Sequence, residues 1–245
     1  YLGPTICPAG MAFIPPGETV VAQGSDPIFI DGFFMDKYEV TGERFLSFAL
    51  DPSNNWHVPD YLASPSVDKS LLGLPVVGVT FYDALAYASR TAPASWAKCA
   101  LPTEAQWARA AYADARPAVP YPWGTEWDPT ALSAAGEADG YSGPAPVGSF
   151  ESDCSPFGCY DVAGNVMEWT CSMFARGSAP SRADVNPAEI WFGSDLAVRG
   201  GSYEHSEVPL TARRSVGFDE TGVQLGFRCA LPFPGDLETI DGFLR

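Results

Sequence analysis

Basic residues and histidines are scarce in this chain of 245 residues. Lysine and arginine together number 14 against 30 aspartates and glutamates, so the formal net charge is −16. An acidic surface of this size repels phosphate backbones and anionic lipid head groups, which argues against nucleic acid and membrane surfaces as partners. With two histidines and no Cys-x-x-Cys pair, the sequence also lacks the usual ligand set of a structural zinc site.

Long apolar runs and catalytic signatures are missing too. No stretch approaches the roughly 20 apolar residues of a membrane-spanning helix, so no membrane insertion is expected. There is no Gly-x-Ser-x-Gly motif, and the glycines after Arg199 do not open a helix as those of a phosphate-binding loop do. The chain starts at Tyr1 without a basic and apolar leader, which we interpret as a mature chain from which any leader was removed.

Six cysteines are present, an even number that fits three disulfides, although the sequence leaves their pairing open. Disulfides persist in oxidising compartments, so we expect an extracytoplasmic protein that is periplasmic, secreted or at the cell surface. The acidic composition is compatible with bound divalent cations there.

The composition favours a single loop-rich α+β domain over residues 1–245. Hydrophobic residues make up 46% of the chain, while glycines (24) and prolines (23) are both frequent, as in proteins whose short elements are joined by ordered loops. Helices are predicted at 44–50 behind the N-cap Thr41, at 81–89 with Asp83 in the first turn, and at 107–112 behind a Thr103–Gln106 capping box. Short strands are predicted at 11–15, 28–36, 198–202 and 226–230, and an irregular tail at 233–245.

Eight segments together carry the most specific pattern in the sequence. They are residues 33–41, 75–84, 101–107, 121–124, 145–150, 158–170, 199–203 and 226–230. Their order and spacing resemble the formylglycine-generating-enzyme (sulfatase-modifying factor) family from about residue 8 to residue 232. The resemblance implies a C-type-lectin-like α+β fold with little regular secondary structure. Members of the family include a copper-dependent oxidase, iron-dependent sulfur-transfer oxidases, siderophore-maturation proteins, ligand-binding variable proteins and a cysteine-less paralogue without oxidase activity, so membership alone leaves the function open.

The resemblance places the oxidase's two copper-binding cysteines, which are five residues apart, at His205 and Leu210. Neither residue is a thiol, and Cu(I) requires soft ligands, so we predict a degenerate site and a pseudoenzyme. An iron site of two histidines and one carboxylate would use His57, His205 and either Glu204 or Glu207. Two surface or groove-lining histidines are the simpler interpretation, and we expect no transition metal.

Residues 161–168 correspond to a calcium-binding segment of the family. The resemblance implies as ligands the side chains of Asp161 and Glu168 and the carbonyls of Gly164 and Val166. Ca²⁺ takes about six to eight hard oxygens, which a tight loop with two carboxylates can supply. The alternative is that Glu168 only accepts hydrogen bonds from backbone amides.

A second calcium site of the family matches Asp139 and Tyr141. Its upstream asparagine has no counterpart near residues 132–133, so one calcium ion is expected and the second site is the weaker prediction. Both sites would stabilise loops that lack secondary structure.

The sequence and the resemblance together indicate which cysteines pair. Cys154 and Cys159 close a short loop and are expected to pair locally. The resemblance implies a disulfide for Cys229, whose family partner position is alanine here, so that Cys99 is the nearest substitute. Cys7 and Cys171 remain by elimination.

Large aromatic and basic side chains are expected mainly in the scaffold. Trp123, Trp127 and Trp169 stand at family-pattern positions and are predicted core residues. Trp56, Trp96 and Trp191 lie in divergent segments, where core packing is preferred over the alternative of a recognition surface. Arg199, Arg213, Arg214 and Arg228 are predicted to be buried ion-pair or groove residues.

The sequence therefore predicts an exported, bacterial, calcium-stabilised binding or structural module without oxidase activity. Its ligand groove is predicted around Ser202, Tyr203, His205 and Met167. Because the enzymatic relatives hold an extended peptide there, the expected partner is a protein or peptide, with the chain as one subunit of a larger assembly an open variant. The alternative function is an iron- or copper-dependent oxidoreductase with a rearranged site that acts on a peptide or small natural product.

Overall fold

The structure, a computed structural model, describes residues 7–64, 68–91, 101–112, 119–134, 136, 138–174 and 195–233. Its helices are α1 (Gly42–Leu50), the 3-10 helix η1 (Lys69–Gly73), α2 (Phe81–Thr91) and α3 (Glu104–Ala111). Its strands are β1 (Met11–Ile14), β2 (Gly17–Thr19), β3 (Ile28–Ile30), β4 (Phe33–Asp36), β5 (Met167–Met173), β6 (Asp195–Arg199), β7 (Arg214–Gly217), β8 (Leu225–Gly226) and β9 (Ala230–Pro232). None of the helices in these ranges is long and apolar enough to span a membrane.

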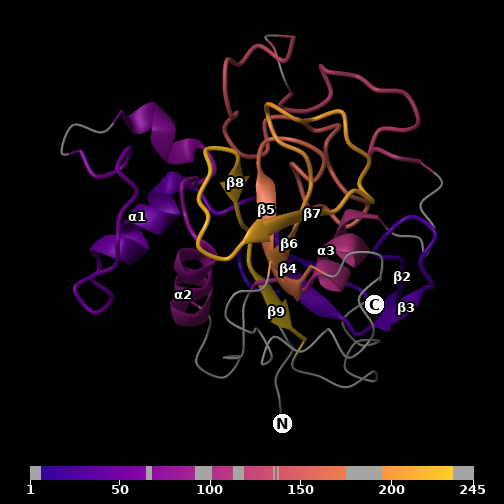
Figure 1. Cartoon of the computed structure of the whole chain (residues 1–245), viewed down its shortest axis with the longest axis horizontal. Coiled ribbons are helices and arrows are strands. Elements are labelled where there is room, and N and C mark those ends of the chain that lie inside the picture. Colours follow the sequence, from indigo (N-terminus) through magenta and orange to yellow (C-terminus); the bar gives the residue numbers. More distant parts are fainter. Residues whose placement is uncertain are drawn as a thin grey trace.

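The strands form three small sheets. Strands β1, β4 and β9 make one antiparallel sheet, β2 and β3 make a two-stranded ribbon, and the largest sheet has the order β7-β6-β5-β8. Helices α1 and α2 lie on one side of this largest sheet, and α3 lies on the other side near β2 and β3 (Figure 1). The predicted α+β, loop-rich fold is thus confirmed.

Two apolar cores meet at strand β4, whose four residues are all buried. Because side chains alternate along a strand, Phe34 packs into the core formed with α1, α2 and β5, while Phe33 and Met35 pack into the core formed with α3. Trp169 belongs to the first core and Trp107 to the second.

The three predicted helices are confirmed because their start signals are local. Thr41 accepts a hydrogen bond from the Arg44 amide at 3.3 Å. Asp83 accepts from the Thr80 amide at 2.8 Å. Both halves of the Thr103–Gln106 capping box are present, at 3.1 and 2.9 Å.

The strand predictions were less accurate. The predicted strand 28–36 is two strands, because β3 pairs with β2 while β4 pairs with β1 and β9. The strand predicted at 198–202 is β6, which ends at Arg199, and the one predicted at 226–230 is divided between β8 and β9. Strand β5 was not predicted, although its residues 167–173 alternate between apolar and polar; in the structure both faces of the strand are buried at 168–172.

Two ion pairs of the buried Glu104 side chain connect α3 to the largest sheet. The Glu104 carboxylate lies 3.1 Å from the Arg199 guanidinium and 2.6 Å from that of Arg213. These arginines are 95 and 109 residues away in the sequence. They confirm the prediction of buried ion-pair arginines.

Of the three tryptophans outside the family pattern, the structure describes one, Trp56. The Trp56 indole packs against the first core and donates to the Asp83 carboxylate at 2.8 Å, so core packing is confirmed for it. Trp96 and Trp191 lie outside the described residues.

Candidate functional site

The predicted groove is built on a tight turn that follows β6. Gly200 has φ +80, and a Cβ atom at Gly201 would lie 2.4 Å from the Ala163 carbonyl oxygen, so glycine is required at both positions. The amides of Ser202 and His205 each donate to the other residue's carbonyl at 3.0 Å, which closes the turn. The chain thereby presents residues 203–205 at the surface beside the 161–168 segment.

Gln224 connects the residues of the groove. Its Oε1 accepts from the Ser202 hydroxyl at 2.8 Å and lies 3.0 Å from His205 Nδ1. Its Nε2 donates to the Glu204 carboxylate, and its carbonyl accepts from the Met167 amide at 2.8 Å. Gln224 could not be predicted, because nothing in the sequence around it indicates contacts with residues about twenty positions earlier.

The structure thus brings Ser202, Tyr203 and His205 together, with Met167 joined through its backbone. The Met167 side chain is half-buried and packs against the first core. Leu210, the second position of the predicted degenerate site, is buried in the second core, and its carbonyl accepts from Arg199 at 2.8 Å. His205 is exposed.

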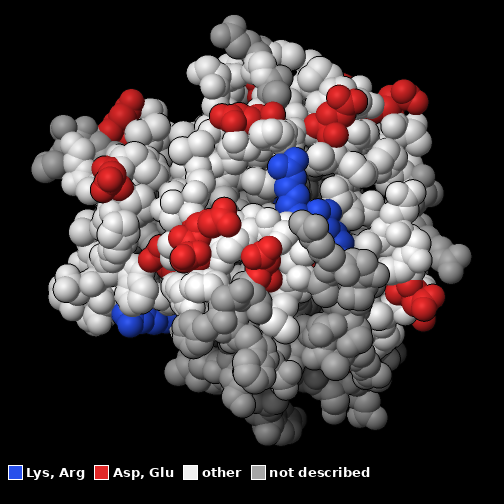
Figure 2. Space-filling model, viewed as in Figure 1, with Lys and Arg blue, Asp and Glu red and all other residues white. Residues whose placement is uncertain are grey.

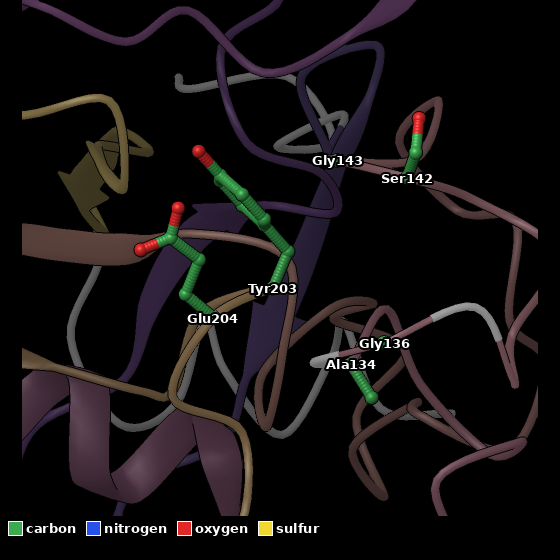
Figure 3. Close-up of a pocket in the computed structure, with 6 residues that line it drawn as sticks. All are labelled: Ala134, Gly136, Ser142, Gly143, Tyr203 and Glu204. Carbon is green, nitrogen blue, oxygen red and sulfur yellow. The ribbon is translucent and has the colours of Figure 1, made fainter.

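Two hollows flank the turn and share Glu204. One has a volume of about 190 Å³ and is lined by Tyr203, Glu204 and loop residues that include Ser142. In Figure 3 the Tyr203 ring and the Glu204 carboxylate point the same way on one side, and Ser142 and Gly143 lie across from them. The other hollow, of about 420 Å³, is lined by Trp127, Pro129, residues 204–208 and Arg214.

A transition-metal site is not assembled among the described residues, in which no three His, Cys, Asp or Glu side chains converge to hold a metal ion. His57 is exposed on the segment between α1 and η1, and His205 bonds to Gln224 instead.

The predicted calcium segment contains a left-handed backbone at two positions, Asp161 (φ 59) and Asn165 (φ 61). The Asp161 carboxylate accepts from the Gly148 amide at 2.6 Å. Glu168 is the second residue of β5, so this end of the segment is a strand and not the loop that was predicted.

The hydrogen bonds to the Glu168 carboxylate come from side chains. The alternative interpretation, in which only backbone amides donate to it, is therefore not met. Its two carboxylate oxygens accept from Arg228 Nη2 at 2.6 Å and Nε at 2.8 Å, and the Trp107 indole donates to it at 2.9 Å. Arg228 is fully buried and also donates to the Tyr160 carbonyl at 2.7 Å.

Two further carboxylates, missed by the sequence analysis, are buried around this segment. Glu39 accepts from the Asn165 side chain at 2.8 Å and from the Val166 amide at 3.2 Å. Asp153 accepts from the amides of Ala163 and Gly164 at 2.9 and 3.0 Å. Each bonds to the backbone of the 161–168 segment, yet each precedes it in the sequence.

These carboxylates resist ionisation because they are buried close together. Burial, followed by the charges of Asp161 and Glu168, raises the pKa of Glu39 well above its usual range. Burial and the Asp161 charge raise the pKa of Asp153 to about 8, and burial raises the pKa of Asp161 to about 6. Arg228 is the cation that lowers the pKa of all three groups.

The residues at the segment offer the oxygen donors and the negative charge that calcium prefers, but no three of their carboxylates converge on one point. Glu39, Asp153, Asp161 and Glu168 are four buried acids, and among the described residues only Glu168 forms an ion pair, with Arg228. Buried carboxylates in excess of their counter-charges are the setting in which a bound cation is stabilising. Asp161, the carbonyls of Gly164 and Val166, and Glu168 would hold it.

At the second predicted site, Asp139 braces its own loop. One carboxylate oxygen accepts from the Ala134 amide at 2.9 Å and the other from the Tyr141 amide at 3.0 Å. The hydroxyl of Ser133 is buried without a hydrogen-bond partner among the described residues. It stands where the family's asparagine is missing.

The predicted disulfides are not found in the described part of the chain. Cys7, Cys154 and Cys159 are free thiols, so the pairings Cys154–Cys159 and Cys7–Cys171 are not formed. Cys154 and Tyr160 pair as an isolated β-bridge, while Cys159 is buried and its amide donates to the Ser155 hydroxyl at 3.1 Å. Cys99 lies outside the described residues, and with it the predicted pairing to Cys229.

Comparison with known proteins identifies the family of this chain. The model of the sulfatase-modifying factor enzyme 1-like (FGE-sulfatase) domain matches residues 5–232, and the chain belongs to this family. It is 34% identical over 201 residues to the formylglycine-generating enzyme of Thermomonospora curvata, covering 73% of this chain and 62% of that enzyme. It therefore spans less than two thirds of that enzyme's length.

Other relatives differ in activity or share the fold alone. The inactive Cα-formylglycine-generating enzyme 2 of Bos taurus is 33% identical over 170 residues, which cover 66% of this chain and 52% of that protein. Among solved structures, PvdO of Pseudomonas aeruginosa superposes with a TM-score of 0.71 at 22% identity, over 91% of this chain and 94% of that one. Treponema denticola variable protein 1 superposes with a TM-score of 0.67 at 20% identity, covering 91% and 95%.

Proposed function

We propose that this chain is an exported, calcium-stabilised binding module of the formylglycine-generating-enzyme family that engages a protein or peptide and carries out no copper–dicysteine oxidation. The observation that carries the proposal is the state of the two positions assigned to the oxidase's cysteines. His205 is exposed in the groove, and Leu210 is buried in an apolar core. A pair of thiolates cannot form from these residues, so the ligands for Cu(I) are absent.

The surroundings of the turn support binding. An extended peptide needs hydrogen-bonding groups for its backbone and recesses for its side chains. The turn offers His205, Tyr203 and Glu204 between two hollows of about 420 and 190 Å³. The Gln224 side chain contacts the side chains of Ser202, Glu204 and His205. Because these side chains are already held in place, less conformational entropy is lost when a ligand binds. A relative at 33% identity that is named inactive is consistent with a non-oxidase role.

Calcium is proposed on the charges of the 161–168 segment. The charges of Asp161 and Glu168 disfavour ionisation of Glu39, and Arg228 offsets this repulsion only in part. A bound calcium ion would offset the remainder. Its role would be structural. Export is proposed on the calcium concentration available outside the cytoplasm.

The first experiment is elemental analysis by mass spectrometry of protein purified without chelators or metal-affinity resin. We expect one to two calcium ions per chain, and no stoichiometric iron or copper. Stoichiometric iron or copper that is lost in His205→Ala but kept in the matched His57→Ala variant would overturn the proposal in favour of an oxidoreductase.

The second experiment tests binding itself. The purified chain is used to capture proteins from extracts of its source, and any captured protein is confirmed by titration with purified components. We expect a Tyr203→Ala/His205→Ala double variant to lose the partner while keeping its circular dichroism spectrum. Retention of the partner by the double variant would show that the groove is not the binding surface.

A further inference from the structure

Arg214 differs from the arginines that form the buried ion pairs of the described residues. Arg199, Arg213 and Arg228 each form an ion pair with Glu104 or Glu168. Arg214 is half-buried and lines the larger hollow, yet within the described part of the chain its guanidinium has neither an ion pair nor a hydrogen bond. A half-buried guanidinium without a partner is unfavourable, because it has lost part of its hydration without compensation.

The sheet directs Arg214 away from the ion pair that its neighbour forms. Strand β7 runs antiparallel to β6, with Arg214 opposite Val198. Arg213, one residue earlier, places its guanidinium 2.6 Å from the buried Glu104 carboxylate. Because consecutive side chains of an extended chain point to opposite faces, Arg214 points away from Glu104, to the face of the sheet that carries Val198. It is also one of the residues that line the larger hollow. In Figure 2 basic side chains lie over β7 at the centre of this face, between groups of acidic ones.

The hollow also has an aromatic surface. Trp127 lines the hollow, and its ring packs against Tyr121 and Trp123 with centroid separations of 5.5 and 6.2 Å. Tyr121 and Trp123 are themselves stacked at 5.0 Å. Such a cluster holds the indole in one orientation, so that the hollow combines one cationic group with one rigid apolar face.

The acidic residues of the hollow limit what can enter it. Glu204 and Glu207 line it as well, and neither carboxylate forms an ion pair with Arg214 among the described residues. Glu204 is instead bonded to Gln224. Two carboxylates near the opening repel a ligand with several negative charges, such as a nucleotide, but not one with a single negative charge next to a neutral or cationic body.

We propose that Arg214 binds a single carboxylate of the groove's ligand, with the rest of that ligand lying against Trp127. The planar guanidinium can bond both oxygens of a carboxylate, a match that an ammonium group cannot make. The carboxylate belongs either to the C-terminus of a peptide or to an Asp or Glu side chain. This inference rests on the proposed peptide-binding function, and it adds the chemical class of the recognised group.

The test uses three pools of N-acetylated tetrapeptides of randomised sequence. The first pool has a free C-terminus and contains no Asp or Glu, the second is its C-terminal amide, and the third is amidated but carries one Glu. Binding to the folded, full chain is followed by tryptophan fluorescence and calorimetry in the wild type, Arg214→Met, Arg214→Lys and the control Arg90→Met. Arg90 is an exposed arginine at the end of α2.

We expect the free-acid or the Glu-containing pool to bind about tenfold or more tightly than the uncharged amide pool, as a charge-assisted pair would give. Preferred binding of the free-acid pool would identify a C-terminal carboxylate, and preferred binding of the Glu-containing pool would identify a side-chain carboxylate. Arg214→Met should remove the preference, Arg214→Lys should keep part of it, and Arg90→Met should leave it unchanged. Glu207→Gln should strengthen carboxylate binding by removing a repulsion.

The possible failures are distinguishable. If all three pools bind equally, or if Arg214→Met keeps the preference, the carboxylate inference is wrong while the groove remains a peptide site. If no pool binds but a protein partner captured by the chain is lost in the Tyr203→Ala/His205→Ala variant, the carboxylate inference is again wrong and the proposed function stands. If neither pools nor partner bind, both proposals are wrong.

Discussion

Arg228 is predicted to be the side chain whose loss destabilises the fold most. It is fully buried and pairs with both oxygens of Glu168, at 2.6 and 2.8 Å. It also donates to the carbonyls of Lys37 at 3.2 Å and Tyr160 at 2.7 Å. Arg228→Met would keep much of the side-chain volume but leave Glu168 as an unpaired buried charge.

The magnitude follows from the cost of that unpaired charge. Removing one partner of a buried ion pair typically lowers the free energy of unfolding by about 3–5 kcal/mol. Domains of this kind have about 5–15 kcal/mol in total, so the loss is a large share of the stability. Arg228→Lys keeps the charge but not the paired geometry and should lose less. Arg90→Met, at an exposed position, should stay within about 0.5 kcal/mol of the wild type.

The assay is urea unfolding followed by tryptophan fluorescence at fixed calcium concentration, with the slope of the transition checked for two-state behaviour. If Arg228→Met does not fold, Glu168→Gln provides the second measurement, since the amide keeps one hydrogen-bond acceptor for Arg228. The double variant should lose less than the sum of the two single losses, because neither charge is left alone. A loss below about 1 kcal/mol in Arg228→Met would refute the reasoning.

Three further predictions concern the calcium segment, the α3 cap and the groove turn. Calcium at about 100 times its dissociation constant should raise the free energy of unfolding by about 2.7 kcal/mol. A chelator should reverse this and magnesium should not reproduce it; equal curves with and without calcium would contradict the site. Thr103→Ala, which removes one half of the capping box on α3, should cost about 1 kcal/mol in the same assay. Gly201→Ala should be strongly destabilising, because the added Cβ would lie 2.4 Å from a carbonyl oxygen. In the matched control Gly73→Ala the added Cβ meets no atom within 4 Å, so this variant should be nearly neutral. Similar stabilities for the two variants would count against the close approach at Gly201.

The helices of this fold were predictable because their signals lie within a few residues of each other. Thr103 and Gln106 define the start of α3 with two hydrogen bonds that span three residues. The α1 and α2 starts follow the same logic. Strands gave weaker signals, since β5 is buried along nearly its whole length and β7 is four residues of mixed character. A strand is defined by its partners, which the local sequence does not specify.

The candidate site shows the same limit more sharply. The residues of the groove turn and of the calcium segment could be assigned by their likeness to a family pattern. Glu39, Asp153 and Gln224 could not, because each acts through contacts with residues 10 to 127 positions away. Arg214 was assigned to a class, buried pair or groove, but only the structure separates it from Arg213, its neighbour in the sequence.

The calcium segment and the groove are joined by the backbone, which leads to a last prediction. The Tyr203 amide donates to the Asn165 carbonyl at 2.8 Å, and the Gly201 amide to the Ala163 carbonyl at 3.1 Å. The groove turn therefore rests directly on the segment that would hold calcium. If calcium orders this segment, chelation should weaken peptide binding as well as stability, and by linkage the peptide should tighten calcium binding by the same factor. Titration of the binding peptide pool with and without calcium measures the first factor, and titration of calcium with and without the peptide measures the second. Peptide affinity that does not change on chelation, in protein that is measurably destabilised by it, would mean that the ion supports the fold without ordering the groove.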